Sequence, residues 1–396
     1  MNKKMVKIPD VLFFQEGPGV RNNQYTSNGV KLLNVANLVD GKVDLSTSDR
    51  YISENEAYGK YKHFLCDDGD FIVASSGIKV EYIDKKMGFV DKSMLPLCMN
   101  TSTIRFKVLN KEQLNIRYFM YYLKSRSFKS QLFKQITGSA QLNYGPSHLK
   151  RMYIPLLSID EQDYIVYFLD KIQTIIDLRK KQLVSLDKLI KARFVEMFGA
   201  LNNTSYETLP LGDICEFIKD GTHQTPTYTE DKVRGYKFLS SKDVTSQKIS
   251  WSNIKYIPES LHNELYSKLA PRRGDILLAK NGTTGVAAVV DTDEVFDIYV
   301  SLALLRPKVG YNSRYLWAVI NSNDTKMQFN ANLKGIGVPN LHLGEIKKAK
   351  VIVPPLEQQE KFAVFLEQID KSKVAVQKAL DEAQLLFDSL MQKYFG

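Results

Sequence analysis

The sequence of 396 residues lacks the short motifs by which many nucleotide-binding enzymes are identified. No GxxxxGKS or GxxxxGKT phosphate loop occurs, and the glycines of Gly17-Pro18-Gly19 do not form a GxGxxG pattern. The Asn-Pro-Pro-aromatic tetrapeptide of amino-methyltransferases is also missing, and the single Pro354-Pro355 pair precedes a leucine instead. These absences predict a chain that is not an enzyme and binds no cofactor of its own.

Potential metal ligands and thiols are few. The five histidines are scattered without metal-ligand spacing, and the three cysteines, Cys66, Cys98 and Cys215, form no CxxC pair. Acid-x-Lys tripeptides resembling those of nucleases occur, for example at Asp84-Lys85-Lys86, but they recur too often to be specific. Three separated thiols are typical of a reducing compartment, so we predict a cytoplasmic protein without a metal site.

Long apolar runs are missing as well. No stretch approaches the roughly 18 apolar residues of a membrane span, and Val11-Leu12-Phe13-Phe14 is too short for the core of a signal peptide. We therefore expect no membrane association. Lys and Arg outnumber Asp and Glu by 54 to 44, giving a net charge of +10, which favours a polyanionic partner such as nucleic acid.

The chain repeats itself at an offset of 197 residues. Phe168-Leu169 recurs as Phe365-Leu366 (365 − 168 = 197), and Gln162 recurs as Gln359. No gap is needed from Gly138 and Gly335 to the end of either copy. Internal repeats of this kind indicate two copies of one structural unit. Here the unit is a globular part followed by a long helix.

The two predicted helices share a heptad pattern. The first runs from about Asp160 to Met197, and the same spacing recurs 197 residues later, as in a coiled-coil seam. Each helix has a polar interruption where the other is apolar, as at Ile176 and Lys373, which favours packing of the two helices on each other. The alternative is that both are ordinary core helices of separate domains. The residues predicted to pack along the spacer are Ile165, Leu169, Ile172, Leu183, Phe362, Leu366, Ile369 and Leu380.

These patterns predict an α+β protein with two repeated domains. We expect a first globular domain over 1–154, a central helix over 155–204, a second globular domain over 205–351 and a C-terminal helix over 352–396. Antiparallel packing of the helices would place the domains at opposite ends of a spacer. Strands are predicted at Val30–Leu38, Asp70–Ala74, Ile104–Val108, Tyr236–Leu239, Asp275–Ala279, Val286–Val290 and Tyr299–Leu305, and helices at Asn115–Ile136 and Ser313–Leu333.

Polar residues suited to reading bases gather in loops of both domains. Arg reads guanine, Asn and Gln read adenine, and Ser and Thr adapt to either. The alternative for any one loop is a solvated surface segment, but strand-then-loop contexts recur at Ser75 and Lys280. The predicted DNA-binding residues are Arg21, Asn22, Asn23, Gln24, Ser75, Ser76, Lys79, Gln141, Asn143, Tyr144, Thr222, His223, Gln224, Ser241, Lys242, Lys280, Asn281, Thr283, Thr284, Asn340 and His342. Phosphate contacts are predicted at Lys124, Arg126, Lys129, Lys134, Arg272 and Arg273.

The segment leading into the second helix carries a family resemblance. Pro354-Pro355-Leu356-Glu357-Gln358-Gln359, followed by Phe365-Leu366, closely resembles the specificity subunit of Type I restriction–modification systems. The first copy keeps Asp160-Glu161-Gln162 but has Leu157-Ser158 in place of the Pro-Pro pair. Gly221-Thr222-His223 and Gly282-Thr283-Thr284-Gly285 also resemble segments of the family's target recognition domains. The resemblance extends over essentially the whole chain.

The resemblance implies a function that the residues alone do not supply. Each target recognition domain would read half of a bipartite site in double-stranded DNA, and the helices would set the spacer. Two methyltransferase subunits, which bind S-adenosylmethionine, would dock on this chain and methylate adenine N6. Restriction subunits that use ATP and Mg would join them to translocate and cleave DNA. The chain itself would be a non-catalytic specificity subunit.

Three other functions remain open at this point. One is the recognition subunit of a related phage-defence methylation system that has no cleaving subunit. Another, from a different class, is a stand-alone nuclease, which would cut DNA with magnesium alone. A purely structural coiled-coil adaptor is a third, but it leaves the paired polar loops unexplained.

Overall fold

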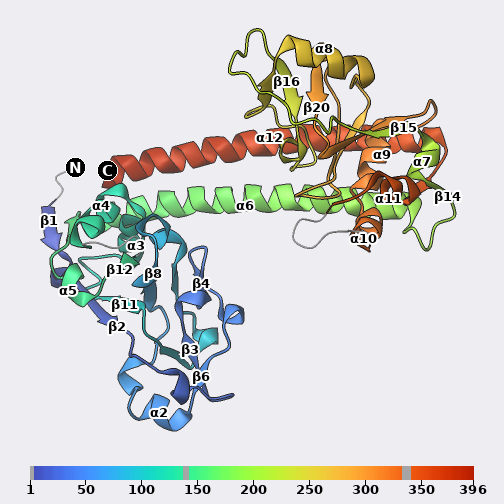
Figure 1. Cartoon of the computed structure of the whole chain (residues 1–396). Helices are drawn as coiled ribbons and strands as arrows, with labels where there is room; N and C mark the ends of the chain where they lie inside the picture. The colour runs from blue at the N-terminus through green and yellow to red at the C-terminus, as the bar shows by residue number, and fades with distance from the viewer. Residues whose placement is uncertain (1–3, 137–141, 332–339) are drawn as a thin grey trace. The chain divides into compact units, whose positions relative to one another are not determined.

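The computed structural model describes residues 4–136, 142–331 and 340–396, and it separates into two compact units (Figure 1). Unit 1 comprises residues 1–179 and 379–396, and unit 2 comprises residues 180–378. Each unit combines helices with small sheets. The prediction of an α+β fold with two repeated domains is therefore confirmed.

The centre of unit 1 is a four-stranded antiparallel sheet. Its order is β2 (Leu12–Glu16), β11 (Thr103–Val108), β7 (Phe71–Ala74) and β9 (Met87–Phe89). Alternate side chains of β7 enter different cores: Phe71 and Val73 pack toward the helices, and Ile72 and Ala74 toward the second sheet. That second sheet has the order β10 (Leu97–Met99), β3 (Val30–Leu33) and β6 (Tyr51–Ile52). Two separate two-stranded sheets are formed by β4 (Leu38–Val39) with β5 (Lys42–Val43) and by β8 (Ser76–Ile78) with β12 (Leu142–Asn143).

Unit 2 repeats this arrangement. Its antiparallel sheet has the order β15 (Cys215–Asp220), β21 (Leu302–Pro307), β18 (Ile276–Ala279) and β19 (Ala287–Val289). The smaller sheet contains β17 (Lys255–Ile257), β16 (Tyr236–Leu239) and β20 (Phe296–Ile298). In both units the middle strand of the smaller sheet is parallel to one neighbour and antiparallel to the other. The repeat seen in the sequence therefore extends to sheet topology.

Each globular part is closed by its own first and last strands. In unit 1, β1 (Lys4–Lys7) pairs antiparallel with β13 (Tyr153–Leu156), and in unit 2, β14 (Glu207–Pro210) pairs with β22 (Lys350–Val353). The last strand then leads directly into a 40-residue helix, α6 (Ile159–Phe198) or α12 (Leu356–Phe395). The predicted long helices are confirmed.

The first long helix begins with a reciprocal cap. The backbone N–H of Ser158 donates to Glu161 Oε2 at 3.2 Å, and the backbone N–H of Glu161 donates to Ser158 Oγ at 3.4 Å. This capping box satisfies N–H groups that have no partner within the helix. The Ser158 that replaces proline in the first copy therefore has a structural role of its own.

Both long helices contribute side chains to the core of each unit. In unit 1, Leu169 of α6 and Phe387 of α12 belong to one buried cluster. In unit 2, the ring centroid of Phe194 lies 5.7 Å from that of Phe362, and Lys373 Nζ lies 2.5 Å from Asp187 Oδ1. From Asp187 to Phe194 the chain advances along α6, whereas their partners on α12 run backwards from Lys373 to Phe362. The two helices are therefore antiparallel within unit 2.

Shorter helices complete each unit. They are α1 (Ile8–Val11), α2 (Glu54–Tyr58), α3 (Ile116–Lys124), α4 (Arg126–Gln135) and α5 (Pro146–Leu149) in unit 1, and α7 (Leu211–Ile214), α8 (Glu259–Lys268), α9 (Ser313–Ile320), α10 (Asn323–Ala331) and α11 (Leu343–Lys348) in unit 2. The single helix predicted over Asn115–Ile136 is wrong, because Ser125 ends α3 and its hydroxyl caps Phe128 N of α4. The helix predicted over Ser313–Leu333 is likewise divided into α9 and α10.

Two predicted strands also need correction. Val30–Leu38 is not one strand, because β3 ends at Leu33 and the backbone N–H of Asn34 donates to Asn37 Oδ1 at 3.0 Å in a 3-10 turn. Tyr299–Leu305 begins too early, since Tyr299 makes an isolated bridge to Thr222 and β21 starts at Leu302. In the first case, a local hydrogen bond to the Asn37 side chain replaces the backbone pairing that would have continued β3.

Candidate nucleic-acid interface

In unit 1, a polar cluster forms where two strands of the central sheet end. The register places Glu16, the last residue of β2, opposite Ile104, and Ala74, the last residue of β7, opposite Thr103. Ser75 therefore follows β7 beside Glu16, and its hydroxyl donates to Glu16 Oε1 at 3.5 Å. The backbone N–H of Tyr144 donates to Ser75 O at 2.9 Å, while Ser76 Oγ donates to Ser102 Oγ at 2.6 Å. This cluster is called polar end 1, comprising Glu16, Ser75, Ser76, Ser102, Asn143 and Tyr144.

Unit 2 has an equivalent cluster. Asp220 ends β15 opposite Ala303, and Lys280 follows β18, the equivalent of β7. The backbone N–H of Leu341 donates to Lys280 O at 3.0 Å, as Tyr144 does to Ser75, and Asn281 bridges to Asn340 as Asn143 pairs with Ser76. This cluster is called polar end 2, comprising Asp220, Thr222, His223, Lys280, Asn281, Ser301 and Asn340.

The two clusters differ in charge. Lys280 Nζ lies 2.5 Å from Asp220 Oδ1, and both side chains are largely withdrawn from solvent. The exposed His223 lies near the same carboxylate, with Nε2 3.5 Å from Asp220 Oδ2. In polar end 1 the position of the lysine is taken by Ser75. Polar end 2 thus contains an internal ion pair where polar end 1 has a carboxylate and a hydroxyl.

Unpartnered polar atoms lie at both ends. The buried Oδ1 atoms of Asn281 and Asn340 accept no hydrogen bond from the residues that the structure describes. The same holds for the hydroxyl of Tyr144, whose pKa is raised by complete burial and by the nearby charge of Glu16. Such atoms are uncommon in folded proteins, and an incoming ligand is one way to satisfy them.

The predicted base-reading residues fall into two groups. Ser75, Ser76, Asn143, Tyr144, Thr222, His223, Lys280, Asn281 and Asn340 lie within the polar ends, and Gln141 lies outside the described residues. Ser241 adjoins polar end 2, since its N–H donates to Ser301 Oγ at 3.0 Å. Outside the polar ends, exposed side chains are found at Arg21, Asn22, Asn23, Lys79, Gln224, Lys242, Thr283 and His342, and Thr284 is half-buried.

Gln24 has a bonding role within unit 1. Its Nε2 donates to Glu56 Oε1 at 2.7 Å and to Tyr61 OH at 3.0 Å, so the side chain ties its turn to α2. Arg21, Asn22 and Asn23 in the same turn are exposed, and their side chains make no comparable bond to the part of the chain that the structure describes. We therefore regard the first three residues of this turn, rather than Gln24, as its candidate contacts.

Sequence reasoning did not recognise the two carboxylates, Glu16 and Asp220, as an equivalent pair. Glu16 and Asp220 each end the first strand of a central sheet, and each is followed by glycine. Gly221 packs so closely that a Cβ would come within 2.2 Å of Ile298 O. An acidic residue before glycine at the same place in both copies was the available signal. It was hidden because the copies differ in offset there.

Most predicted phosphate contacts are engaged within the protein. Lys129 pairs with Asp84 at 2.8 Å, and Arg272 Nη2 lies 3.7 Å from Glu216 Oε2. Lys124 lies over the ring of Tyr121, and burial lowers its pKa. Arg126 and Lys134 are exposed and make no ion pair with the described part of the chain. They are the stronger candidates.

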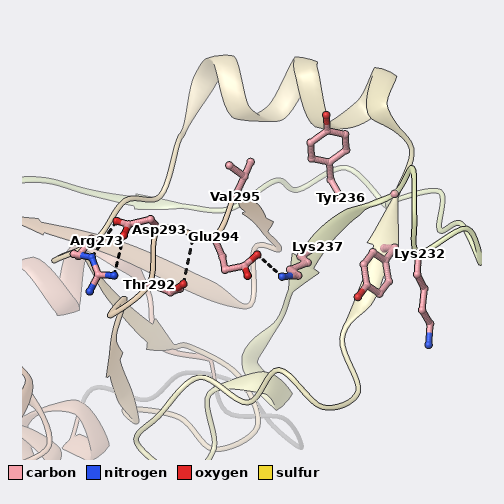
Figure 2. A pocket seen from close by; sticks show the side chains of 10 residues that line it. Lys232, Tyr236, Lys237, Arg273, Thr292, Asp293, Glu294 and Val295 are labelled. Atoms are coloured by element: carbon pink, nitrogen blue, oxygen red, sulfur yellow. Dashed lines mark hydrogen bonds and ion pairs between the residues drawn. The ribbon is translucent and has the colours of Figure 1, made fainter.

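A pocket of about 640 Å³ in unit 2 is a second candidate site (Figure 2). Figure 2 shows Lys237 joined to Glu294 and Arg273 joined to Asp293, with Arg273 Nη2 2.9 Å from Asp293 Oδ2. The charges at this pocket are thus largely neutralised by one another. For this reason we place the interface at the polar ends and not at this pocket. Arg273, a predicted phosphate contact, already forms an ion pair with Asp293.

The predicted spacer residues occupy buried or half-buried positions. Ile165, Leu169 and Ile172 are buried in unit 1, where Leu380 packs against the same cluster. Phe362 and Leu366 are buried in the core of unit 2, Ile369 is buried, and Leu183 is half-buried.

A second, exposed apolar stripe runs along the first half of α6. Tyr164, Phe168, Ile175 and Leu178 recur at steps of four, seven and three, and Tyr167 lies beside Phe168 with ring centroids 5.3 Å apart. Tyr164, Tyr167 and Leu178 are each more than half exposed. Clustered exposed aromatics on one helix face are typical of an interaction surface.

Within residues 4–136, 142–331 and 340–396, no group of three or more His, Cys, Asp or Glu side chains is arranged to hold a metal ion. Over the same residues, every helix is too short or too polar to cross a bilayer.

Comparisons with known proteins agree with this architecture. The Type I restriction modification DNA specificity domain family matches twice, over residues 2–188 and 203–383. The MjaVIII specificity subunit of Methanocaldococcus jannaschii, a Type I restriction enzyme component, is 26% identical over 192 residues, 48% of this chain. That match covers 43% of the relative, so the chain spans less than half its length.

Two further similarities extend over most of the chain. A putative MjaX specificity subunit from the same organism is 24% identical over 393 residues, covering 89% of this chain and 84% of the relative. The crystal structure of a Type I restriction–modification S subunit from M. genitalium covers 100% of this chain and 96% of that chain. Its TM-score is 0.55 at 16% identity, which shows a shared fold.

Proposed function

The chain belongs to the Type I restriction–modification DNA specificity family, and from this membership we propose that it reads a bipartite site in double-stranded DNA. Unit 1 reads one half through polar end 1, and unit 2 reads the other half through polar end 2. The chain is a recognition component and not an enzyme. Chemistry on the DNA is supplied by its partners.

The repeated polar ends are the observation that carries this proposal. Equivalent strands, β7 and β18, end in equivalent backbone bonds, yet the side chains that follow are Ser75 in one unit and Lys280 in the other. A shared scaffold with different polar groups suits two readers of different sequences. Side chains of this kind distinguish bases in the major groove through hydrogen bonds.

The charge of the chain lies mainly in the first globular part. Residues 1–154 contain 23 Lys and Arg against 14 Asp and Glu, a balance of +9. Residues 205–351 contain 19 against 16, a balance of +3. Both parts therefore attract the phosphate backbone, and the first does so more strongly. Binding should weaken steeply with salt, because each neutralised phosphate releases counterions.

The long helices are proposed to act as the spacer. Each contributes buried side chains to both units, for example Ile165 and Phe194 of α6. Two linked readers gain affinity only when their separation matches the DNA. Seven residues inserted in each helix lengthen it by about 10 Å. At about 3.4 Å per base pair, the unread spacer should grow by about three base pairs.

Partners complete the proposed function. We propose that two methyltransferase subunits holding S-adenosylmethionine dock on this chain, and that restriction subunits using ATP and Mg join them. The exposed stripe of Tyr164, Tyr167 and Phe168 supports such docking. This chain holds none of those cofactors itself. A related phage-defence system without a cleaving subunit would use the chain in the same way.

Single-molecule sequencing of DNA from cells that express this chain with its neighbouring methyltransferase tests the proposal. We expect N6-methyladenine in a split motif that disappears when this gene is removed. An active methyltransferase that yields no such motif with this chain would refute it. Cleavage of DNA by the purified chain with magnesium alone would favour the stand-alone nuclease instead.

A further inference from the structure

The two units place a carboxylate at the same point of the fold. Glu16 ends β2 opposite Ile104, and Asp220 ends β15 opposite Ala303, in each case beside the strand end that begins the polar loop. The equivalence of the two positions was not predicted from the sequence. Because the surrounding backbone bonds are equivalent, the two carboxylates can be compared directly.

Asp220 is neutralised within unit 2. Lys280 Nζ lies 2.5 Å from its Oδ1, and only 6% of the lysine side chain and 16% of the aspartate side chain are exposed. His223 Nε2 lies 3.5 Å from the other oxygen. Asp220 Oδ1 is buried and accepts no well-aligned hydrogen bond from the described residues, so the lysine compensates its charge and burial keeps this oxygen from DNA.

Glu16 lacks such a partner. The position equivalent to Lys280 is Ser75 in unit 1, and the Ser75 hydroxyl donates to Glu16 Oε1 at the long distance of 3.5 Å. No Lys, Arg or His in residues 4–136, 142–331 or 340–396 forms an ion pair with Glu16. A Cβ on Gly145 would come within 3.3 Å of Oε2, so the backbone passes close to the carboxylate. Glu16 is half-buried and retains an opening to solvent.

A carboxylate in this state accepts hydrogen bonds and donates none. In the major groove, cytosine N4 and adenine N6 present donors, whereas guanine and thymine present acceptors at O6, N7 and O4. Phosphate oxygens would be repelled by the same charge. The group is therefore suited to an exocyclic amino group and selects against the other major-groove edges.

We propose that Glu16 is a specificity-determining residue that accepts a hydrogen bond from the exocyclic amino group of one base in the half-site read by unit 1. This inference rests on the proposed function of the chain. Unit 2 lacks an equivalent contact, because its carboxylate, Asp220, is paired with Lys280. One half-site then requires cytosine or adenine at a position where the other half-site has no such requirement.

The test compares wild type, Glu16→Gln and Asp220→Asn, each purified with the methyltransferase. Methylation is measured on duplexes that carry each of the four bases at every position of both half-sites. In Glu16→Gln the amide adds a donor that can pair with guanine O6 or thymine O4, so the discrimination against guanine and thymine at one position should fall by about 5- to 150-fold, the value typical of a good base contact. The other half-site should keep its preferences. The base preferred by wild type at that position identifies the donor as cytosine N4 or adenine N6.

Asp220→Asn is the matched control in unit 2. It should leave the position changed by Glu16→Gln as in wild type. Unchanged preferences throughout both half-sites for Glu16→Gln would overturn the inference, as would an Asp220→Asn change at the same position. If Glu16→Gln abolishes methylation, fluorescence anisotropy with the same duplexes decides. Equal weakening for all four bases overturns the inference, and loss of preference at one position supports it.

The proposed function and this inference fail in different ways. If the proposed function is wrong, the wild-type chain directs no split methylation motif. If only the role of Glu16 is wrong, the wild-type motif is present and Glu16→Gln reproduces it at every position.

Discussion

Gln162 and Gln359 occupy equivalent, almost fully buried positions in the first turns of α6 and α12 and make equivalent bonds. Oε1 of Gln162 accepts the backbone N–H of Asn115 at 3.0 Å, and Oε1 of Gln359 accepts that of Asn312 at 2.9 Å. Each Nε2 donates to a carbonyl of the segment leading into the helix. Each glutamine thereby fixes the start of a long helix to the start of the first helix after the central sheet.

Gln162→Ala should destabilise unit 1. The substitution leaves the part-buried N–H of Asn115 and the buried carbonyl of Leu157 without their partner, each costing about 1–3 kcal/mol. Chemical denaturation followed by circular dichroism measures the effect. Gln173→Ala on the same helix removes only a bond to Asp177 one turn away and should change stability by less than about 0.5 kcal/mol. Equal effects of the two substitutions would contradict this role.

Leu169→Asp and Leu366→Asp should each unfold the core that the residue enters. Both leucines are buried, at 0% and 1% exposure, in units 1 and 2 respectively, and an unpaired charge there is strongly destabilising. Limited proteolysis should show cleavage of the corresponding unit, and assembly with the methyltransferase should be lost. Val184→Asp, at a position 55% exposed, is the control and should assemble normally. Normal assembly of Leu169→Asp would show that this helix face is not needed.

The three cysteines should be unreactive in the folded protein. Burial raises the pKa of Cys66, Cys98 and Cys215 from 9.0 to about 12. The thiolate fraction at pH 8 is therefore roughly a thousandfold lower than for a free thiol. Titration with a disulfide reagent should detect the thiols only after denaturation. Rapid reaction of one or more thiols in the native protein would show that their burial is transient.

Stability should fall in alkali. A thiol of pKa about 12 in the fold and 9.0 when unfolded contributes stability that is fully present below pH 9 and is lost as the pH rises toward 12. Burial also raises the pKa of Tyr122 to about 12 and that of Tyr118 above its usual value, with the same sign. Denaturation midpoints measured from pH 8 to 11 should decrease. Midpoints that stay constant above pH 9 would mean that these groups ionise within the fold.

Tyr167→Ala combined with Phe168→Ala should weaken binding of the methyltransferase. The two rings are exposed and adjacent on α6, so their loss removes apolar contact area without opening the core of unit 1. We expect the dissociation constant to rise at least about tenfold, the effect of losing about 1.4 kcal/mol. Val195→Ala, on an exposed face of the same helix, should bind like wild type. Wild-type affinity of the double variant would place the partner elsewhere.

The sequence predicted the long-range organisation better than the local breaks. Sustained apolar spacing over 40 residues allowed α6 and α12 to be recognised because that spacing occurs in the primary structure. The break between α3 and α4 depends on whether Ser125 caps a new helix, and the apolar pattern passes through it unchanged. The turn after β3 likewise depends on the reciprocal bonds of Asn34 and Asn37.

Only part of the candidate site could be predicted from the sequence. Ser75 and Lys280 could be found because each directly follows a recognisable strand. Glu16 could not, because its neighbour Ser75 is 59 residues away and only the register of β2 and β7 on β11 brings them together. The ion pair of Asp220 with Lys280 was invisible for the same reason.

The pairing of first and last strands also has an evolutionary consequence. Because β1 pairs with β13 and β14 pairs with β22, each globular part enters and leaves its sheet system at one place. Recombination within the coding segments of these strands could replace the whole intervening part while leaving the helix that follows unaltered. A lineage of such genes can therefore diversify by exchanging whole modules, each arriving with its own strand pair already matched.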